Sequence, residues 1–364
     1  MELIELFKKI LQAKSETPDD GGLLDFVTGY LPGFTSVRLD TNGVKNLFIY
    51  RKFGEGRHLC FAGHVDVVPA GDGWSVDPYA AVERDGYIYG RGAQDMKSGF
   101  TAFLQAVKEM EHFDGTLSLL LTSDEEGPAK HGTLEVLKYL EKEKMLPDAC
   151  IVAEPTCEEV FGDAIKIGRR GSINGVIEKH GKQGHAAYPE KATNPIHKVA
   201  QVLHHMAGVN LDEGDENFAP SKFVVTDIRA GMEVTNVTPG KLKMMFNVRN
   251  STKTDQKTIE DFVHKYFSEM NYTLKLDQSA YPFMTDPNTR IVRTIDAAIK
   301  KVTGIKPKHS TAGGTSDARY IAPYGVDVIE FGVRNDTIHA PDERTTREEV
   351  EKLCAVFKEV IATF

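Results

Sequence analysis

In the first half of the chain, short apolar runs alternate with stretches in which apolar residues recur every three or four positions. The runs have the length of buried strands, and the recurring positions have the period of amphipathic helices. Alternation of the two is typical of an α/β fold with a largely parallel sheet. The strands expected on this basis are 46–50, 58–62, 116–122 and 149–153, and the helices are 98–110 and 132–142.

The pattern changes after about residue 171. The next elements follow the order strand, helix, strand, strand, helix, strand, which is the order of a ferredoxin-like α+β unit. The expected strands are 173–179, 222–229, 241–248 and 273–277, and the expected helices are 195–207 and 255–270.

After Pro282 the α/β pattern resumes, with helices expected at 291–302 and 346–362 around a strand at 326–331. We therefore expect a zinc-peptidase-like catalytic domain with a mostly parallel central sheet, formed by residues 1–170 and 284–364. The inserted ferredoxin-like domain would span residues 171–283 and act as a dimerisation or lid domain.

Length and composition favour a folded, two-domain protein. A chain of 364 residues exceeds a comfortable single core. Its hydrophobic content of 41% and charged content of 27% are ordinary for a globular protein. The formal net charge of −9 argues against binding to a nucleic-acid backbone. No apolar run approaches the roughly 20 residues that cross a bilayer, so we expect no membrane span.

The cysteines and the N-terminal segment favour a reducing compartment. Cys60, Cys150, Cys157 and Cys354 are scattered without a CxxC spacing. The segment MELIELFKKIL has the pattern of an amphipathic helix and not that of a signal peptide. We therefore expect the protein in the cytoplasm.

Five segments place an acid or a histidine directly after an apolar run: FAGHVDVVP, GRGAQDMKSG, TSDEEG, VAEPT and NDTIHAPDE. The ends of strands deliver side chains to the rim of a sheet, so these donors can meet. Imidazole and carboxylate ligands suit zinc, cobalt or manganese, whereas a structural zinc site is usually rich in cysteine. Each residue alone is more often structural. Together they favour a hydrolytic metal site made of His64, Asp95, Glu126, Glu154 and His339.

If two metal ions lie roughly 3.5–4 Å apart, one carboxylate must bridge them. Asp95 is the best candidate, because it lies in a glycine-punctuated turn just before an expected helix. His64 and Glu154 would be the remaining ligands of one ion, and Glu126 and His339 those of the other.

Two further acids have expected roles beside the ligands. Glu125 is adjacent to Glu126, so its carboxylate can point at the bridging water and act as general base. Asp66 follows His64 by two residues, which on an extended segment puts both side chains on one face. We therefore expect the carboxylate of Asp66 to orient the imidazole.

Over nearly its whole length the chain resembles the co-catalytic dizinc aminoacylase and carboxypeptidase family. The resemblance implies two zinc ions per subunit, with cobalt or manganese as substitutes, and the same ligand and base assignments. It also implies a cis peptide bond between Asp95 and Met96. The segments that carry it, in order, are HLCFAGHVDVVPAGDGW, YGRGAQDMKSG, TSDEEGPA, VAEPT, IGRRGS, GKQGHAAYP, TNVTPG, NVRNST, AGGTSDARY and EFGVRNDTIHAPDE.

Within this family, GRGAQDMKSG, IGRRGS and AGGTSDARY look most like the members that act on N-succinyl-LL-2,6-diaminopimelate. Those members release succinate and LL-2,6-diaminopimelate in bacterial lysine and meso-diaminopimelate synthesis. The alternatives are a relative that releases another acyl group, as acetylornithine deacetylase does, or a dizinc carboxypeptidase. An inactive metal-binding paralogue is a further alternative, but Glu125 and all five donors are present.

The resemblance also implies residues that bind substrate. His185 in GKQGHAAYP and Asn236 in TNVTPG would complete the oxyanion site across the interface of a homodimer. The substrate carboxylates need cations and backbone NH groups, which arginines and a glycine-rich turn can supply. The positions that match the family's carboxylate binders are Arg170, Arg249, Arg319, Gly314 and Thr315.

Two positions depart from the family pattern. Gln94 stands where a small residue or an acid is frequent, and Asn250 stands where an aromatic residue is common. Neither is an expected metal ligand.

Overall fold

A computed structural model describes residues 1–364 and divides them into two compact units. The first unit comprises Met1–Gly168, Met284–Ser310 and Ser316–Phe364, and the second comprises Arg169–Phe283 and Thr311–Thr315. The five residues from Thr311 to Thr315 differ from the sequence-based expectation, which assigned them to the returning part of the catalytic domain.

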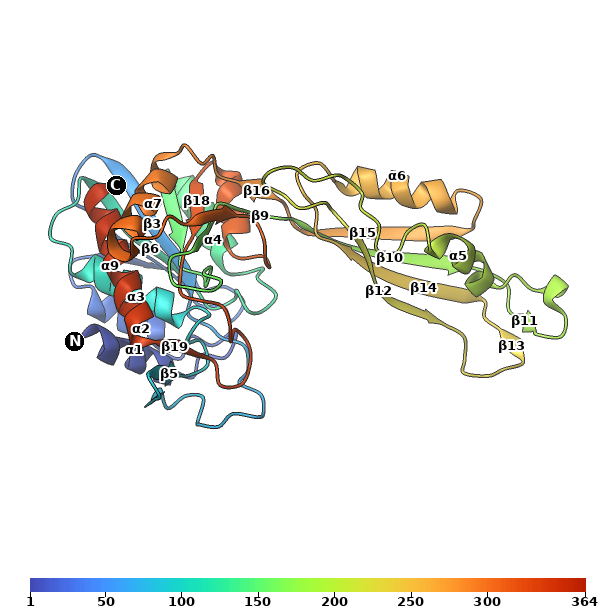
Figure 1. Ribbon diagram of the computed structural model, residues 1–364, viewed down its shortest axis with the longest axis horizontal. Coiled ribbons are helices and arrows are strands. Elements are labelled where there is room, and N and C mark those ends of the chain that lie inside the picture. The colour runs from blue at the N-terminus through green and yellow to red at the C-terminus, as the bar shows by residue number, and fades with distance from the viewer. The chain divides into compact units, whose positions relative to one another are not determined.

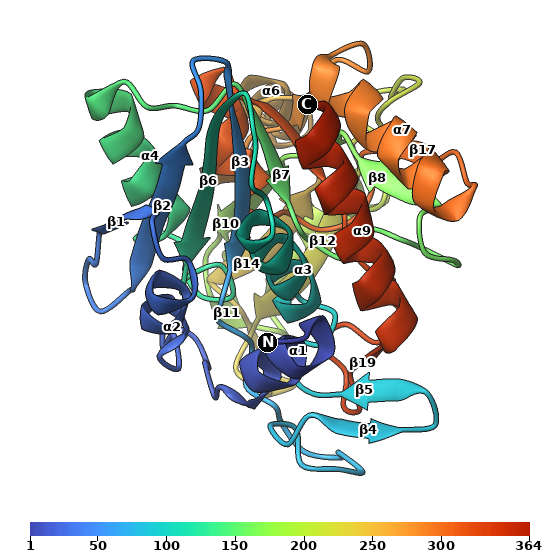
Figure 2. The ribbon, with the colours of Figure 1, turned by 90° about the vertical axis from the view of Figure 1, so that its left-hand side faces the viewer.

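An eight-stranded sheet forms the centre of the first unit and confirms the expected α/β class. The neighbours β6, β3, β7 and β18 run parallel, while β1 and β2 at one side are antiparallel. Figure 2 shows β2, β6, β3 and β7 side by side. In spatial order the strands are β1 (Thr35–Arg38), β2 (Asn46–Lys52), β6 (Gly115–Thr122), β3 (Arg57–His64), β7 (Ala149–Val152), β18 (Asp327–Glu330), β8 (Ala164–Lys166) and β17 (Lys308–Ser310).

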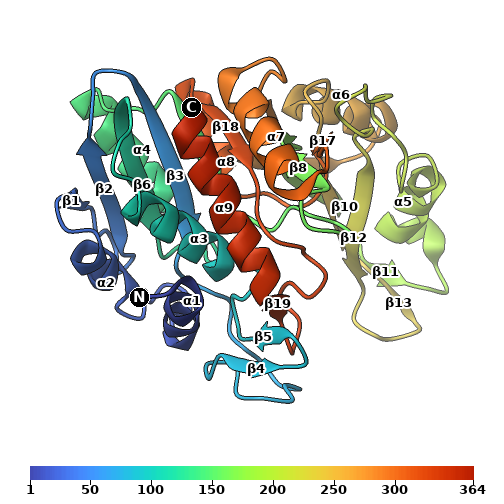
Figure 3. The same cartoon turned by 60° about the vertical axis from the view of Figure 1, so that its left-hand side comes forward.

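Helices cover both faces of this sheet. Figures 2 and 3 show α1 (Leu3–Gln12), α3 (Lys97–Lys108), α7 (Arg290–Thr303) and α9 (Arg347–Thr363) side by side over one face. Apolar residues that alternate along each strand bury against them; Phe61, for example, stacks on Phe103 and meets Phe357 edge-on. The other helices of this unit are α2 (Leu23–Tyr30), α4 (Thr133–Glu143) and α8 (Ala318–Ile321); α4 contacts α8, β2 and β6.

A small sheet of three short strands lies beside the N-terminal part of the first unit. Its strands are β4 (Val82–Arg84), β5 (Tyr87–Tyr89) and β19 (Arg344–Thr346), in the order β19-β5-β4. Arg344 pairs with Tyr89 in the antiparallel β19–β5 ladder. This pairing joins the segment after Tyr89 to the segment before Arg344, which are far apart in the sequence.

The second unit contains a four-stranded antiparallel sheet in the order β12-β14-β10-β15 (Figure 1). Helices α5 (Pro195–Leu203) and α6 (Gln256–Phe267) bury their apolar residues against it. The chain order confirms the expected ferredoxin-like β-α-β-β-α-β pattern, although α5 ends at Leu203 and not near residue 207. The strands are β10 (Ser172–His180), β12 (Phe223–Ala230), β14 (Lys241–Val248) and β15 (Tyr272–Ala280).

Short elements complete the chain. In the second unit, β11 (Gly184–His185) pairs with β13 (Val237–Thr238). Where the chain passes between the units, β9 (Gly168–Arg169) pairs with β16 (Phe283–Met284). Two single-turn 3-10 helices, η1 (Pro189–Lys191) and η2 (Ala322–Tyr324), lie in the second and the first unit respectively. None of the helices combines the length and apolar character that a membrane crossing requires.

Candidate metal centre

The central sheet brings the expected metal ligands to one edge. His64 is the last residue of β3, Glu126 follows β6, and Glu154 follows β7. These three strands are parallel neighbours, so their carboxyl ends lie at the same edge. Asp95 lies in the turn before α3, and His339 lies in the segment before β19.

Asp95 lies between two imidazoles. Its Oδ1 is 3.1 Å from Nε2 of His64, and its Oδ2 is 3.1 Å from Nε2 of His339. Each imidazole also faces a glutamate: Glu154 Oε1 is 3.7 Å from His64 Nε2, and Glu126 Oε1 is 2.8 Å from His339 Nε2. One carboxylate is thus shared by two histidine–glutamate pairs.

The donor chemistry of this group fits a divalent metal ion. One ligand atom from each of His64, Asp95 and Glu126 lies within 4.8 Å of the others. Nδ1 of His64 is 2.8 Å from the backbone oxygen of Asp66, which leaves Nε2 to face the carboxylates. A ring nitrogen fixed in this way is usual for a metal-binding histidine.

Asp66 contacts both His64 and the turn that carries Glu125 and Glu126. The hydrogen bond of His64 runs to the backbone oxygen of Asp66, while the Asp66 carboxylate lies 3.7 Å from the same ring nitrogen. That carboxylate also accepts hydrogen bonds from the backbone NH groups of Glu125, at 3.4 Å, and Glu126, at 3.2 Å. Asp66 is therefore placed to fix the turn that carries the expected base and a ligand.

Burial and crowding shift Glu125 and Glu154 towards their neutral forms, whereas hydrogen bonds to the two imidazoles lower the pKa of Asp95 against the effect of burial. Burial and the nearby Asp95 carboxylate raise the pKa of Glu154 well above its usual range. Burial, together with neighbouring carboxylates, raises the pKa of Glu125 to about 8. Carboxylates that repel one another in a buried site are stabilised by a bound cation, which again suits a metal ion.

The two imidazoles hold protons more tightly than usual. Burial alone would lower the pKa of His64, but the carboxylates of Asp95 and Glu154 raise it well above its ordinary value. Hydrogen bonds to Asp95 and Glu126 raise the pKa of His339 to about 10. A metal ion at this site must therefore displace protons from both rings.

Two backbone features accompany the ligands. The peptide bond between Asp95 and Met96 is cis, as the family resemblance implied. His339 has a φ of 59°, in the left-handed region that residues with a Cβ seldom adopt.

The substrate-binding residues expected from the sequence are divided between the two units. Arg319 lies in α8 of the first unit, with its guanidinium 4.7 Å from the centre of the Tyr320 ring. The others belong to the second unit: Arg170, His185, Asn236, Arg249, Gly314 and Thr315.

Within the second unit these residues form two groups. His185 and Asn236 are neighbours, because β11 pairs with β13 and the backbone NH of Ala186 donates to the Asn236 oxygen at 2.9 Å. Both side chains are exposed.

Arg170 and Arg249 adjoin a pair of residues, Gly171 and Asn250, whose backbones exchange hydrogen bonds of 2.8 and 3.2 Å. The loop that carries Gly314 and Thr315 is tied to the same unit, since the Arg169 guanidinium donates to the oxygen of Ala312 at 3.0 Å.

Two buried acids beside the centre, Asp317 and Glu343, were not expected from the sequence. Asp317 accepts a 2.7 Å hydrogen bond from the Thr133 hydroxyl, and Glu343 accepts hydrogen bonds from three backbone NH groups of the segment that carries Asp95. Both acids lie within the segments AGGTSDARY and NDTIHAPDE that carried the resemblance. Their presence in these segments could have drawn attention to both acids, but their hydrogen-bond partners are known only from the fold.

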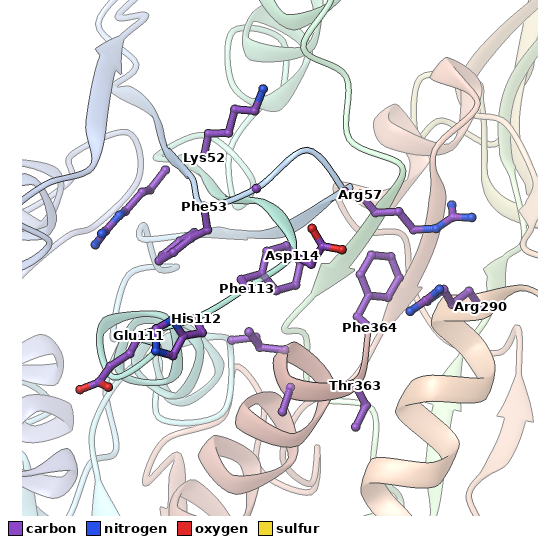
Figure 4. A pocket seen from close by; sticks show the side chains of 15 residues that line it. Lys52, Phe53, Arg57, Glu111, His112, Phe113, Asp114, Arg290, Thr363 and Phe364 are labelled. Carbon is purple, nitrogen blue, oxygen red and sulfur yellow. The ribbon is translucent and has the colours of Figure 1, made fainter.

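A large cavity of about 930 Å³ lies away from the metal centre (Figure 4). Its lining includes Arg57 at the start of β3 and Asp114 just before β6, together with Phe364 after α9. The centre lies at the opposite ends of β3 and β6, so this cavity contains none of the expected site residues.

The sequence matches the model of peptidase family M20/M25/M40 over residues 60–363. The chain belongs to this family. M20 family proteins are metal-dependent, and the cluster of His64, Asp95 and Glu126 is a potential metal-binding group of this member.

Known relatives cover the full chain. The succinyl-diaminopimelate desuccinylase of Nitratiruptor sp. is 72% identical over 100% of both chains, and that of Sulfurimonas denitrificans is 68% identical over 100% of both. Among solved structures, the aminopeptidase PepT of Bacillus cereus has a TM-score of 0.83 at 20% identity, covering 99% of this chain and 98% of that one. That likeness shows the M20 fold.

Proposed function

We propose that this M20 family member hydrolyses N-succinyl-LL-2,6-diaminopimelate to succinate and LL-2,6-diaminopimelate. The observation that carries the proposal is the full-length identity of 72% and 68% to proteins named succinyl-diaminopimelate desuccinylase. The reaction belongs to bacterial lysine and meso-diaminopimelate synthesis, which takes place in the cytoplasm.

The metal centre is proposed to hold two divalent ions, zinc in the first instance, with cobalt or manganese as substitutes. His64 and Glu154 would hold one ion, Glu126 and His339 the other, and Asp95 both. The two oxygens of Asp95 already face different imidazoles at 3.1 Å, which supports the bridging role. When bound, such ions polarise a carbonyl oxygen and make water a better nucleophile.

Glu125 is proposed as the general base. Its carboxyl lies beside the ligand Glu126, on a turn held by the carboxylate of Asp66. It would take a proton from the attacking water and return that proton to the amide nitrogen as the C–N bond breaks. Without metal ions, burial and neighbouring carboxylates raise the pKa of Glu125 to about 8; bound cations would lower that pKa and favour the carboxylate that accepts the proton.

The second unit is proposed to bind the carboxylates of the substrate. Arg170 and Arg249 adjoin paired residues there, and arginine suits bidentate binding of a carboxylate. Gly314 and Thr315 would add backbone NH groups, and Arg319 would act from the first unit.

The protein is proposed to form a homodimer through the second unit, so that His185 and Asn236 act on the partner's substrate as donors to the developing oxyanion. Their adjacency at the β11–β13 pair and their exposure support a shared role. Removing one such donor typically costs about 2.7–4 kcal/mol in transition-state stabilisation.

The test compares hydrolysis of N-succinyl-LL-2,6-diaminopimelate with that of N-acetylornithine by zinc-loaded protein, with the released amine detected by mass spectrometry. Glu125→Gln should abolish succinyl release. Glu143→Gln, which changes an exposed glutamate on α4, is the matched control and should leave activity unchanged.

Activity only on the acetyl substrate would assign the chain to a deacetylase and leave the metal centre intact. Activity on neither substrate would reject the proposed acyl group. Full activity of Glu125→Gln would reject the proposed base.

A further inference from the structure

The amide of Gln94, a buried side chain, joins the two ends of the loop that carries His339. We call residues 336–344 the His339 loop. The Nε2 of Gln94 donates to Asp336 Oδ1 at 2.6 Å and to the oxygen of Arg344 at 2.9 Å. Its Oε1 accepts from the backbone NH of Thr337 at 2.9 Å. The side chain is 1% exposed and contacts both ends of the loop.

Hydrogen bonds to Glu343 fix the backbone from Gly92 to Asp95, which carries Gln94. The buried carboxylate of Glu343 accepts from the NH groups of Gly92, Gln94 and Asp95 at 3.0, 2.8 and 3.1 Å. It also accepts a 2.7 Å hydrogen bond from the Arg91 guanidinium. The Asp95 segment is thereby fixed, so a side chain that projects from it can act as a fixed anchor.

His339 needs such an anchor more than the other imidazole does. The side chain of His64 is 1% exposed and ends a central strand, whereas that of His339 is 46% exposed and lies in a loop. His339 also has a φ of 59°, a conformation that costs free energy unless neighbouring contacts impose it. The Arg91 guanidinium donates to the backbone oxygens of His339, at 3.2 Å, and Ala340, at 3.3 Å. Arg91 therefore holds the middle of the loop, while Gln94 joins its two ends.

We propose that Gln94 is a positioning residue that sets His339 relative to Asp95. Because Gln94 directly precedes Asp95 and binds both ends of the His339 loop, it links the shared carboxylate to the less constrained imidazole. It would therefore act on the affinity for the ion that His339 holds and leave the ion held by His64 and Glu154 unaffected. This inference rests on the two-ion centre proposed above.

The contacts explain why an amide is needed here. An alanine would lose all three hydrogen bonds and leave the Thr337 NH without its acceptor. A glutamate would keep that acceptor but would turn a carboxylate towards the Asp336 carboxylate and the Arg344 oxygen. Small residues and acids are frequent at this position in the family, but neither can make all three hydrogen bonds that join the two ends of the His339 loop.

The experiment measures the two binding constants for Co²⁺ on the metal-free full-length protein, by calorimetry and by the visible absorption of the bound ion. His339→Ala identifies the binding step that belongs to the His339 ion. Gln94→Ala should weaken that step by about 10–100-fold, a usual effect of losing a partner outside the ligand shell. The other step should stay within about twofold of wild type.

Two further variants separate positioning from general stability. Gln105→Ala removes another buried glutamine of the first unit, which accepts a 2.7 Å hydrogen bond from the Tyr30 hydroxyl far along α3. It should lower the unfolding temperature without changing either Co²⁺ constant. Gln94→Glu should behave like Gln94→Ala, and adding Asp336→Asn should restore part of the lost affinity, because the two changes exchange amide and carboxylate across one hydrogen bond.

Loss of affinity at the His339 step alone would support the inference. Unchanged constants in Gln94→Ala, or equal weakening of both steps, would overturn it. If wild-type protein took up a single ion, the two-ion proposal would be rejected and this inference with it. That outcome is distinguishable, because it appears without any substitution.

Discussion

Replacing Gly99 by alanine should push helix α3 away from strand β7. Gly99 lies in the first turn of α3, four residues after Asp95. A Cβ at this position would lie 2.1 Å from the backbone oxygen of Ala153 and 2.6 Å from the Ala153 Cβ. Ala153 directly precedes Glu154. The substitution therefore strains the contact between the segments that carry two of the expected ligands.

The size of the effect follows from this geometry. Backbone atoms must separate by roughly 1 Å to admit the methyl group, and overpacking of this kind costs about 1–3 kcal/mol. Alanine in place of glycine within a helix returns about 0.5–1 kcal/mol. Gly29 of α2 is a matched control, because a Cβ there meets nothing within 4 Å. Gly29→Ala should therefore stabilise the protein while Gly99→Ala destabilises it.

Urea unfolding of the metal-free protein measures both effects. Trp74 is the single tryptophan and lies in the first unit, so its fluorescence reports on the unit that contains both glycines. Gly99→Ala should unfold at lower urea than wild type and should also bind Zn²⁺ more weakly. A Gly99→Ala protein as stable as wild type, with unchanged zinc affinity, would refute the packing argument.

Three further outcomes are expected. Zinc binding at pH 7 should release protons, because the pKa values of both imidazoles and of the Glu154 carboxyl are raised in the metal-free centre. Calorimetry in buffers of different ionisation enthalpy measures this release, and zero release would contradict the raised pKa values. Asp66→Asn should lower kcat by about 10–100-fold with little change in KM. The reason is that an amide oxygen accepts hydrogen bonds from the NH groups of Glu125 and Glu126 more weakly than a carboxylate does. Steady-state kinetics test this, and an unchanged kcat would count against it. Hydrogen bonds lower the pKa of Asp212 against the opposing effect of burial, so its contribution to stability is present above the unfolded pKa of about 4 and is lost as the pH falls through the lower folded value. Asp212→Asn should flatten the acid dependence of thermal unfolding of the second unit, and an unchanged pH profile would contradict the assignment.

Much of the fold followed from hydrophobic periodicity. The strand expected at 241–248 is β14, and the strand expected at 116–122 differs from β6 by one residue. The sheet of β4, β5 and β19 was missed, because strands of three residues are too short to show an alternating pattern. Helix α5 was expected to be too long because apolar residues continue beyond Leu203, where the backbone already turns.

The candidate ligands could be found from the sequence because parallel strands end at one edge of a sheet. His64 and Glu154 illustrate this, since each closely follows an apolar run. The partners of these ligands could not be found in the same way. The contact of Gln94 with the His339 loop depends on the pairing of β5 with β19, and the turn held by Asp66 depends on which of its oxygens faces His64. Such contacts are set by tertiary geometry and leave no periodic trace.

Strand β18 lies between β7 and β8 in the central sheet, yet it is synthesised after the whole second unit. On the ribosome, the strands of the second unit emerge together and can pair with one another while β7, already next to β3, still lacks β18 on its other side. A nascent chain therefore carries an open apolar strand edge until Asp327–Glu330 has emerged, and such edges favour association with other chains. His339 likewise emerges only after the second unit, so the metal centre cannot be assembled before that unit has been made.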